Sequence, residues 1–214
     1  MLDNIPLFSG LNEQELVHIS QHATTRTYPK NTVIITEGDP AETLYIIIKG
    51  KVKVLLNDEA GKEVIINCQG PGEYFGELAL IDEAQRSATV ITMETSTFSV
   101  IAKHSFHDIL ANNPSIALSL IRDLTQRVRV LTDNVKSLAL MDVYGRVAKT
   151  LLGMATEHNG KLLIEDKLTQ QDIASRIGAS REMVSRILKD LETGGYISMK
   201  HKHIVINEML PKHY

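Results

Sequence analysis

The sequence has 214 residues, of which 43% are hydrophobic and 23% charged, with a net charge of −3 at pH 7. This is the composition of an ordinary globular protein with a buried core, and a net negative charge argues against a nucleic-acid binder if the molecule is treated as uniform. No stretch approaches the eighteen or so consecutive apolar residues that span a bilayer, and MLDNIPLFSG lacks the basic start and long apolar stretch of a secretory signal. A single cysteine, Cys68, excludes an internal disulfide, a four-cysteine zinc site and a cysteine-ligated iron–sulfur cluster within one chain. We interpret it as a small core residue and expect a cytoplasmic protein with no membrane contact.

The charge is unevenly distributed along the chain. Residues 145–214 contain 11 basic and 8 acidic side chains, a net charge of +3, whereas residues 1–144 contain 12 and 18, a net charge of −6. An acidic first part joined to a basic second part indicates that only the second part meets phosphate.

Within the first 101 residues, the sequence pattern changes near Thr27 from helical to β-rich. Residues 3–23 predict a short helical lead-in with Leu11, Leu16 and Ile19 near one face. From about Thr27 to Ile101 the chain consists of short β-rich runs separated by glycines: NTVIITEG, TLYIIIKG, KVKVLL, KEVIINC, ATVITM and STFSVIA. Strands at this regular spacing predict an antiparallel barrel or jelly roll, with a hairpin turn at NDEAGKE.

A long helix is predicted after Pro114. Its apolar residues alternate in steps of four and three: Ala117, Ile121, Leu124, Val128, Leu131, Val135 and Leu138. This heptad pattern, flanked by charged residues, favours a parallel homodimeric coiled coil through residues 117–138. The alternative is that the same residues pack on the core of their own domain.

The C-terminal part predicts a winged helix-turn-helix. After a bend near Met141–Asp142, the helix VYGRVAKTLLGMA is ended by HNG. Two further helical segments follow, LTQQDIASRIG and ASREMVSRILKDLETGG, and then two short strands, YISMK and HIVIN, joined by HK. The class is therefore α+β: an N-terminal antiparallel β-roll (residues 1–112), a dimerisation helix with a hinge (113–141) and a winged helix-turn-helix (142–214).

The predicted helix-turn-helix has an apolar inner face and a polar, charged outer face. Thr169 and Ser180 are suited to cap them, and Gly178 permits the tight turn between them. The predicted inner face holds Ile173, Ala174, Ile177, Val184, Ile187, Leu188 and Leu191. The outer face holds Arg181, Glu182, Ser185, Arg186 and Lys189. Arginine pairs bidentately with guanine and glutamate accepts from the cytosine amino group, so this face favours double-stranded DNA over a merely solvated surface.

The segment GELALIDEAQRSATV, residues 76–90, has the chemistry of an anion site. Gly76 lets the backbone approach a ligand closely, and a short helical turn beginning there directs N–H groups outward. Arg86 supplies a delocalised cation, and Ser87 and Ala88 add donors for a phosphate. Glu77 is compatible with a phosphate ligand only if it accepts from hydroxyls such as a ribose 2′-OH. The segment therefore favours a small cyclic nucleotide over a plain strand–turn–strand in which Arg86 pairs with an acid.

The chain resembles the bacterial cyclic-AMP receptor protein (catabolite activator) and FNR-type family of transcription regulators over almost its whole length. The resemblance is carried by SREMVSRILKDLE and by the cassette GEL…RSA, whose intervening turn is one residue shorter here. It implies cyclic AMP (cAMP) as allosteric effector, half-sites of the type TGTGA, and RNA polymerase as a partner. It assigns nucleotide binding to Gly76, Glu77, Leu78, Arg86, Ser87, Ala88, Arg127 and Thr132. It assigns base reading to Arg181, Glu182 and Arg186, and phosphate contacts to Thr169, Gln171 and Ser180.

One departure from the family concerns the nucleobase. cAMP binders of this family offer adjacent Thr and Ser from the long helix, where this chain has Leu131–Thr132. Leu131 neither donates nor accepts hydrogen bonds, whereas Thr132 keeps that ability and Arg127 matches a position that ties the helix to the pocket glutamate. We therefore expect phosphate and ribose recognition to be intact, while cyclic GMP (cGMP) as effector, or a reduced affinity for cAMP, stays open.

Other functions find little support in the residues. The cysteine cluster of the oxygen-sensing branch is missing, residues 27–101 contain no histidine for a cupin-type metal site, and no catalytic triad, P-loop or acid pair stands out. His201 and His203 could form a metal pair, but they lack a third ligand and occupy the wing tip. We predict a protein that is not an enzyme and holds no metal. The remaining rival is a regulator that binds DNA without a small-molecule effector.

Overall fold

The computed structural model describes residues 5–8, 13–59, 61, 63–158, 161–165, 168–200 and 203–210. The chain divides into two compact units, Met1–Arg129 and Val130–Tyr214, and each is considered by itself. None of the described helices has both the length and the apolar character that crossing a membrane requires.

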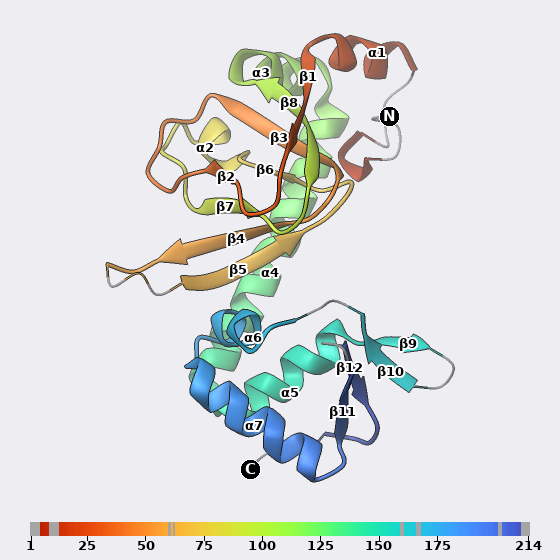
Figure 1. Cartoon of the computed structure of the whole chain (residues 1–214). Helices are drawn as coiled ribbons and strands as arrows, with labels where there is room; N and C mark the ends of the chain where they lie inside the picture. The colour runs from red at the N-terminus through yellow and green to blue at the C-terminus, as the bar shows by residue number, and fades with distance from the viewer. Residues whose placement is uncertain are drawn as a thin grey trace. The chain divides into compact units, whose positions relative to one another are not determined.

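The first unit is an antiparallel β-roll with helices before and after it (Figure 1). Its elements are η1 (Pro6–Phe8), α1 (Glu13–Gln21), β1 (Ala23–Tyr28), β2 (Val33–Ile35), β3 (Thr43–Lys49), β4 (Val52–Asn57), β5 (Glu63–Gln69), β6 (Tyr74–Phe75), α2 (Leu78–Ile81), β7 (Thr89–Thr92), β8 (Ser96–Ala102) and α3 (Lys103–Asn112), followed by α4 (Pro114–Leu140). Two four-stranded sheets have the orders β1-β8-β3-β6 and β2-β7-β4-β5, and every described pairing is antiparallel. The predicted jelly-roll-like architecture is confirmed.

The six predicted strands are present as β2, β3, β4, β5, β7 and β8. Two further described strands, β1 and β6, were not predicted from the sequence. β1 has the sequence ATTRTY, whose four central residues are exposed, so no alternation of apolar side chains marks it. Its pairing along the length of β8 makes it a strand. The predicted lead-in helix is present only as η1 and α1; Ile19 is buried, whereas Leu11 lies outside the described residues. Helix α3 was also not predicted.

Helix α4 buries only one side of its first half. Ile116 and Leu120 belong to the core of the first unit, and Leu124 packs partly against it. The exposed fractions are 58% for Ile121 and 61% for Val128, two members of the predicted heptad pattern. The alternative in which the whole pattern faces its own core is therefore wrong for these two residues, although Leu124 does pack inward.

The described part of the second unit consists of the end of α4, further helices and a small sheet (Figure 1). The elements are α5 (Val143–Met154), β9 (Thr156–His158), β10 (Lys161–Ile164), α6 (Gln170–Ile177), α7 (Arg181–Thr193), β11 (Ile197–Lys200) and β12 (His203–Ile206), with the sheet order β11-β12-β10-β9. The predicted bend is confirmed: α4 ends at Leu140, and the Asp142 side chain caps α5 by accepting from the Gly145 amide at 2.7 Å.

The prediction that HNG ends a helix is wrong, because α5 already ends at Met154 and the next residues form β9 and β10. These two strands were not predicted. Each is short, and β10 is held by β12, which lies about 40 residues further along the chain. The wing hairpin β11–β12 is present as predicted, with its connecting residues 201–202 outside the described range.

Candidate functional site

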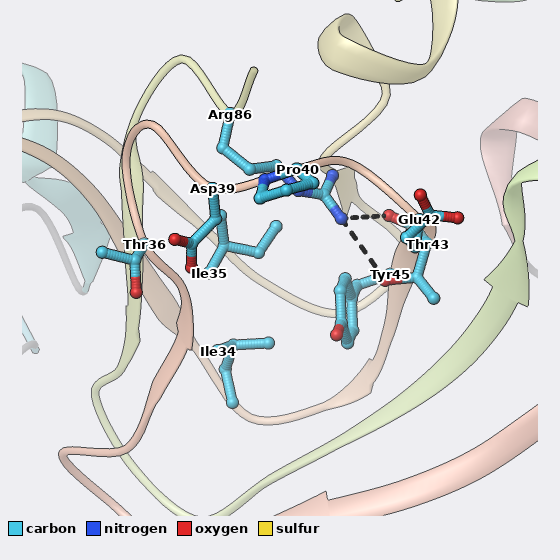
Figure 2. Close-up of a pocket in the computed structure, with 9 residues that line it drawn as sticks. All are labelled: Ile34, Ile35, Thr36, Asp39, Pro40, Glu42, Thr43, Tyr45 and Arg86. Carbon is cyan, nitrogen blue, oxygen red and sulfur yellow. Dashed lines mark hydrogen bonds between the residues drawn. The ribbon is translucent and has the colours of Figure 1, made fainter. Parts of the chain in front are cut away.

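A pocket of about 150 Å³ lies in the first unit, beside the residues predicted to bind an anion (Figure 2). It is lined by Ile34, Ile35, Thr36, Asp39, Pro40, Glu42, Thr43, Tyr45 and Arg86. Only Arg86 was singled out from the sequence. Thr43 and Tyr45 lie on β3, where TLYIIIKG reads as an ordinary buried strand, so nothing local marks them as pocket residues.

Arg86 brings a cation into this pocket although its side chain is only 6% exposed. Its Nη1 donates to the Gly76 carbonyl at 2.8 Å, and its Nη2 donates to the carbonyl and hydroxyl oxygens of Thr43 at 2.8 and 3.3 Å. Figure 2 shows the side chain reaching toward Thr43. Burial lowers the pKa of Arg86, against the opposing effect of Tyr45 and nearby acids. Since a guanidinium stays protonated in proteins, the pocket holds a buried positive charge whose donors face backbone oxygens.

Gly76 is required here for two physical reasons. Its φ is +87°, in the left-handed region that favours glycine. A Cβ at this position would lie 2.6 Å from Arg86 Nη1 and 3.2 Å from the Thr43 carbonyl. Any larger residue would therefore displace the arginine from its oxygen acceptors.

Glu77 is almost fully buried, with an exposed fraction of 2%, and pairs with Arg127 of α4. The distance between Arg127 Nη1 and Glu77 Oε1 is 2.7 Å. Burial raises the pKa of Glu77, while the charge of Arg127 opposes this effect. The contact that the family resemblance implied between the long helix and the cassette glutamate is present in the structure.

Tyr74 extends this link to a second residue of α4. Arg127 Nη2 donates to the Tyr74 carbonyl at 3.1 Å, and its Cζ lies 4.8 Å from the centre of the Tyr74 ring. The Tyr74 hydroxyl donates to Asp123 Oδ2 at 3.1 Å, and burial raises the pKa of this phenol above its ordinary value. β6 is thus joined to α4 by two hydrogen bonds and a cation–π contact, and Glu77, two residues after β6, adds the ion pair. Tyr74 and Asp123 were not identified from the sequence.

The remaining predicted nucleotide residues occupy neighbouring positions in the same segment. Leu78 begins α2 and is exposed, Ser87 is exposed, and Ala88 is buried just before β7. The short helical turn expected after Gly76 is present as α2, with Glu77 at its N-cap. Thr132 lies on the part of α4 that belongs to the second unit, where its side chain is exposed.

The predicted helix-turn-helix is present in the second unit. Thr169 caps α6: its Oγ1 accepts from the Asp172 amide at 3.1 Å, and Asp172 Oδ2 accepts from the Thr169 amide at 2.8 Å. Gly178 has a φ of 65° and ends α6 in the left-handed conformation. Ser180 caps α7 by accepting from the Met183 amide at 3.2 Å. The hydroxyls of Thr169 and Ser180, predicted to contact DNA phosphates, therefore also serve the two helix starts.

The faces of α7 divide as predicted. Val184, Ile187, Leu188 and Leu191 belong to the core of the unit, together with Ile173, Ala174 and Ile177 of α6. On the other side, the exposed residues are Arg181, Glu182, Arg186 and Lys189, and Ser185 is half-buried. Gln171 of α6 is exposed, and its Nε2 donates to Ser175 Oγ at 3.3 Å. One helix face therefore presents three cations and a carboxylate without any of the core residues.

Within the part of the chain that the structure describes, no three histidine, cysteine, aspartate or glutamate side chains gather in a way that could hold a metal ion. Of the two wing histidines considered for this role, His203 begins β12 and His201 lies outside the described residues.

Comparisons with known proteins identify a family domain in each of the two units. Residues 25–113 match the cyclic nucleotide-binding domain, and residues 145–209 match the Crp-like helix-turn-helix domain. The chain is 39% identical to the cAMP-activated global transcriptional regulator CRP of Escherichia coli O157:H7 over 189 residues, which cover 86% of this chain and 90% of that protein. It is 32% identical to the CRP-like cAMP-activated global transcriptional regulator of Mycobacterium tuberculosis over 206 residues, covering 94% and 92% of the two chains.

A solved structure with similar architecture is that of CLP, the c-di-GMP responsive global regulator of Xanthomonas campestris. The TM-score is 0.82 and the sequence identity 26%, with 92% of this chain and all of that chain covered. The relatives named above thus include two regulators that are activated by cAMP and one that responds to c-di-GMP. The chain belongs to the CRP/FNR family of ligand-responsive, DNA-binding transcription regulators.

Proposed function

We propose that this protein is a cAMP-gated transcription regulator that binds TGTGA-type palindromes as a homodimer. The observation that supports it best is that one unit holds both a buried guanidinium, at Arg86, and a buried carboxylate, at Glu77. One group suits the cyclic phosphate and the other suits a ribose hydroxyl, which together describe a cyclic nucleotide. The E. coli and M. tuberculosis relatives are named as cAMP-activated, which supports cAMP as the effector.

Arg86 would hold the phosphate. Its Nη atoms donate to carbonyl oxygens of Gly76 and Thr43, which are neutral acceptors. A cyclic phosphate offers the same nitrogen atoms a charged acceptor, and hydrogen bonds between ionised groups are roughly twice as strong as neutral ones. Ser87 and Ala88 follow Arg86 directly in the chain, and the exposed Ser87 hydroxyl and the backbone amides of both residues would supply further donors. The short helix that begins at Leu78 would add backbone N–H groups.

Glu77 would bind the ribose. Its Oε1 is paired with Arg127, and a carboxylate has further lone pairs with which to accept from the 2′-OH. Because Arg127 belongs to α4, the group that touches the sugar is directly bonded to the long helix. Nucleotide binding would change the strength of this bond and so the position of α4.

The long helix would form the dimer. Exposed apolar side chains recur along it at Ile121, Val128, Leu131, Val135 and Leu138. In a parallel coiled coil these residues would be buried between the two copies, and burial of apolar surface drives association. In this arrangement Thr132 of one copy would reach the base bound by its partner.

The outer face of α7 would read DNA. Arg181 and Arg186 are suited to guanine, Glu182 to cytosine, and Lys189 to the phosphate backbone. In the ligand-bound dimer the two α7 helices would reach successive major grooves, roughly 34 Å apart. The expected coupling between effector and DNA is about 1–3 kcal/mol. RNA polymerase is the expected partner of the DNA-bound protein, which regulates transcription and carries out no catalysis.

A second candidate effector is cGMP. It is favoured by Leu131, whose side chain can form no hydrogen bond with adenine. The rest of the proposal is unchanged in that case, because phosphate and ribose are common to both nucleotides.

The deciding experiment is a calorimetric titration with cAMP and with cGMP, each paired with a gel shift on a TGTGA palindrome at fixed salt. We expect cAMP to bind and to switch on the DNA shift in the unchanged protein. Arg86→Ala should abolish both responses while leaving salt-dependent, nonspecific DNA binding in place. DNA affinity that is the same with and without nucleotide, in both proteins, would instead support an effector-independent regulator.

A further inference from the structure

The side-chain oxygen of Gln69 is a buried hydrogen-bond acceptor to which no described residue donates. It ends β5, opposite Val52 of β4, and its exposed fraction is 2%. Its Nε2 donates to the Tyr74 carbonyl at 2.9 Å. Among the described residues, none supplies a hydrogen bond to Gln69 Oε1, which is itself fully buried.

The orientation of this carboxamide follows from its neighbour. The Tyr74 carbonyl can only accept, so the amide nitrogen must face it, and the opposite orientation would place two acceptor oxygens against each other. Oε1 therefore points away from the Tyr74 carbonyl. A buried acceptor without a partner costs free energy, and folded proteins keep such a group rarely and for a specific reason.

The position of Gln69 connects it to the Glu77 side of the nucleotide site. The same Tyr74 carbonyl that accepts from Gln69 also accepts from Arg127 Nη2 at 3.1 Å. Arg127 Nη1 in turn bonds to Glu77 at 2.7 Å. The carboxamide of Gln69 and the guanidinium that holds the ribose-binding glutamate therefore meet at one oxygen atom.

The chemistry of the effector identifies which group fits this acceptor. cAMP carries two kinds of hydrogen-bond donor, the ribose 2′-OH and the 6-amino group of adenine. Glu77, as a carboxylate, is the stronger acceptor for the hydroxyl. The phosphate and the remaining ring nitrogen atoms of the base are acceptors and would be repelled by Oε1. The 6-amino group is the donor that remains.

We propose that Gln69 is a specificity-determining residue, whose Oε1 accepts a hydrogen bond from the 6-amino group of the bound adenine. This inference rests on the proposed function and deepens it. It supplies the base contact that Leu131 cannot make, and it places base recognition on the β-roll, in the same unit as the phosphate and ribose contacts. Because Gln69 Nε2 and Arg127 Nη2 both donate to the Tyr74 carbonyl, the bound base would be linked to Arg127 through Gln69 and Tyr74.

The test compares cAMP with purine riboside 3′,5′-cyclic monophosphate, which has hydrogen in place of the 6-amino group. Both are titrated calorimetrically into the unchanged protein, Gln69→Leu and Gln69→Met. The unchanged protein should prefer cAMP by about tenfold, the effect expected of one hydrogen bond. In both variants the preference should fall to within about twofold of unity, because neither leucine nor methionine carries an acceptor oxygen.

Ser87→Ala is the matched control. It removes a donor to the phosphate, which both nucleotides share, so it should weaken both and leave their ratio as in the unchanged protein. A ratio that survives in Gln69→Leu and Gln69→Met would overturn the inference and leave Gln69 with a purely structural bond to Tyr74. Thermal melting identifies a variant that fails to fold, in which case the other variant decides.

The two proposals fail in different ways. If the unchanged protein binds both nucleotides with equal affinity, only the proposed role of Gln69 is contradicted. Binding of neither nucleotide would remove the proposed cAMP effector, and the role of Gln69 with it.

Discussion

The pocket and the recognition helix hold their charged groups in opposite ways. In the first unit, Arg86, which lines the pocket, and Glu77 are only 6% and 2% exposed. Arg86 donates hydrogen bonds to the Gly76 and Thr43 carbonyls, and Glu77 is paired with Arg127. On α7, Arg181, Arg186 and Lys189 are exposed to solvent. Buried charges interact strongly and depend on each partner, whereas exposed charges are screened and move freely. The first arrangement suits a small ligand of defined shape, and the second suits a long polyanion that is read at several points.

The largest expected effect tests the buried side of this comparison. Arg127→Leu leaves Glu77 buried without its cation. Loss of one partner of a fully buried pair costs about 3–5 kcal/mol, and because Arg127 itself is 30% exposed we expect about 2–3 kcal/mol in the free energy of unfolding. Urea denaturation at pH 7 measures this. Arg122→Leu, which removes an exposed cation from the same helix, should change stability by less than about 0.5 kcal/mol.

The same variant has a pH dependence whose sign follows from Glu77. Burial raises the pKa of this carboxyl, so the folded protein holds the proton to higher pH than the unfolded chain does. A group of this kind favours folding when it is protonated, and that contribution is lost as the pH rises from the unfolded pKa through the folded pKa. Without Arg127 the pKa should rise further. The destabilisation of Arg127→Leu should therefore shrink between pH 7 and pH 5, and a constant or growing loss would contradict this account of Glu77.

A second variant tests whether the pocket tolerates a change in backbone. Gly76→Ala places a methyl group 2.6 Å from Arg86 Nη1 at a φ of +87°. We expect a loss of about 1–3 kcal/mol in stability from the backbone conformation, together with weaker nucleotide binding from the displaced arginine. Gly70→Ala is the control, since a Cβ there meets nothing within 4 Å and φ is not positive. Equal effects in the two variants would show that the geometry around Arg86 is not a constraint.

The smallest expected effect on folding lies on the exposed side. Arg181→Ala should leave the free energy of unfolding within about 0.5 kcal/mol of its original value, because the side chain is exposed. The free energy of DNA binding should weaken by about 1–3 kcal/mol because one base contact is lost. The protein should then discriminate less between bases at that one position of the half-site. Lys189→Ala should instead weaken all DNA sequences alike and reduce the salt slope by about one. Competition gel shifts with single-base variants of the palindrome separate the two patterns, and uniform loss in Arg181→Ala would argue against direct base reading.

The sequence by itself determined the recognition helix and the order of the domains. The apolar spacing of α7, its serine cap and the glycine before it are local signals, and each lies within a few residues of the feature that it controls. Of the eight strands that the structure describes in the β-roll, six were likewise marked by their own apolar residues and by the glycines between them. The cassette residues Gly76, Glu77 and Arg86 were found because they are close together in the chain.

Tertiary structure decided what those residues touch. Arg86 bonds to Thr43 across 43 positions, Glu77 to Arg127 across 50, and Tyr74 to Asp123 across 49. No local pattern distinguishes Thr43, Tyr74 or Gln69 from ordinary residues of a strand. β1 and β10 also depend on ladders formed with distant strands. The physical reason is that helix caps and amphipathic faces are properties of neighbouring residues, whereas a buried charge acquires its partners only when the sheets and α4 bring distant segments together.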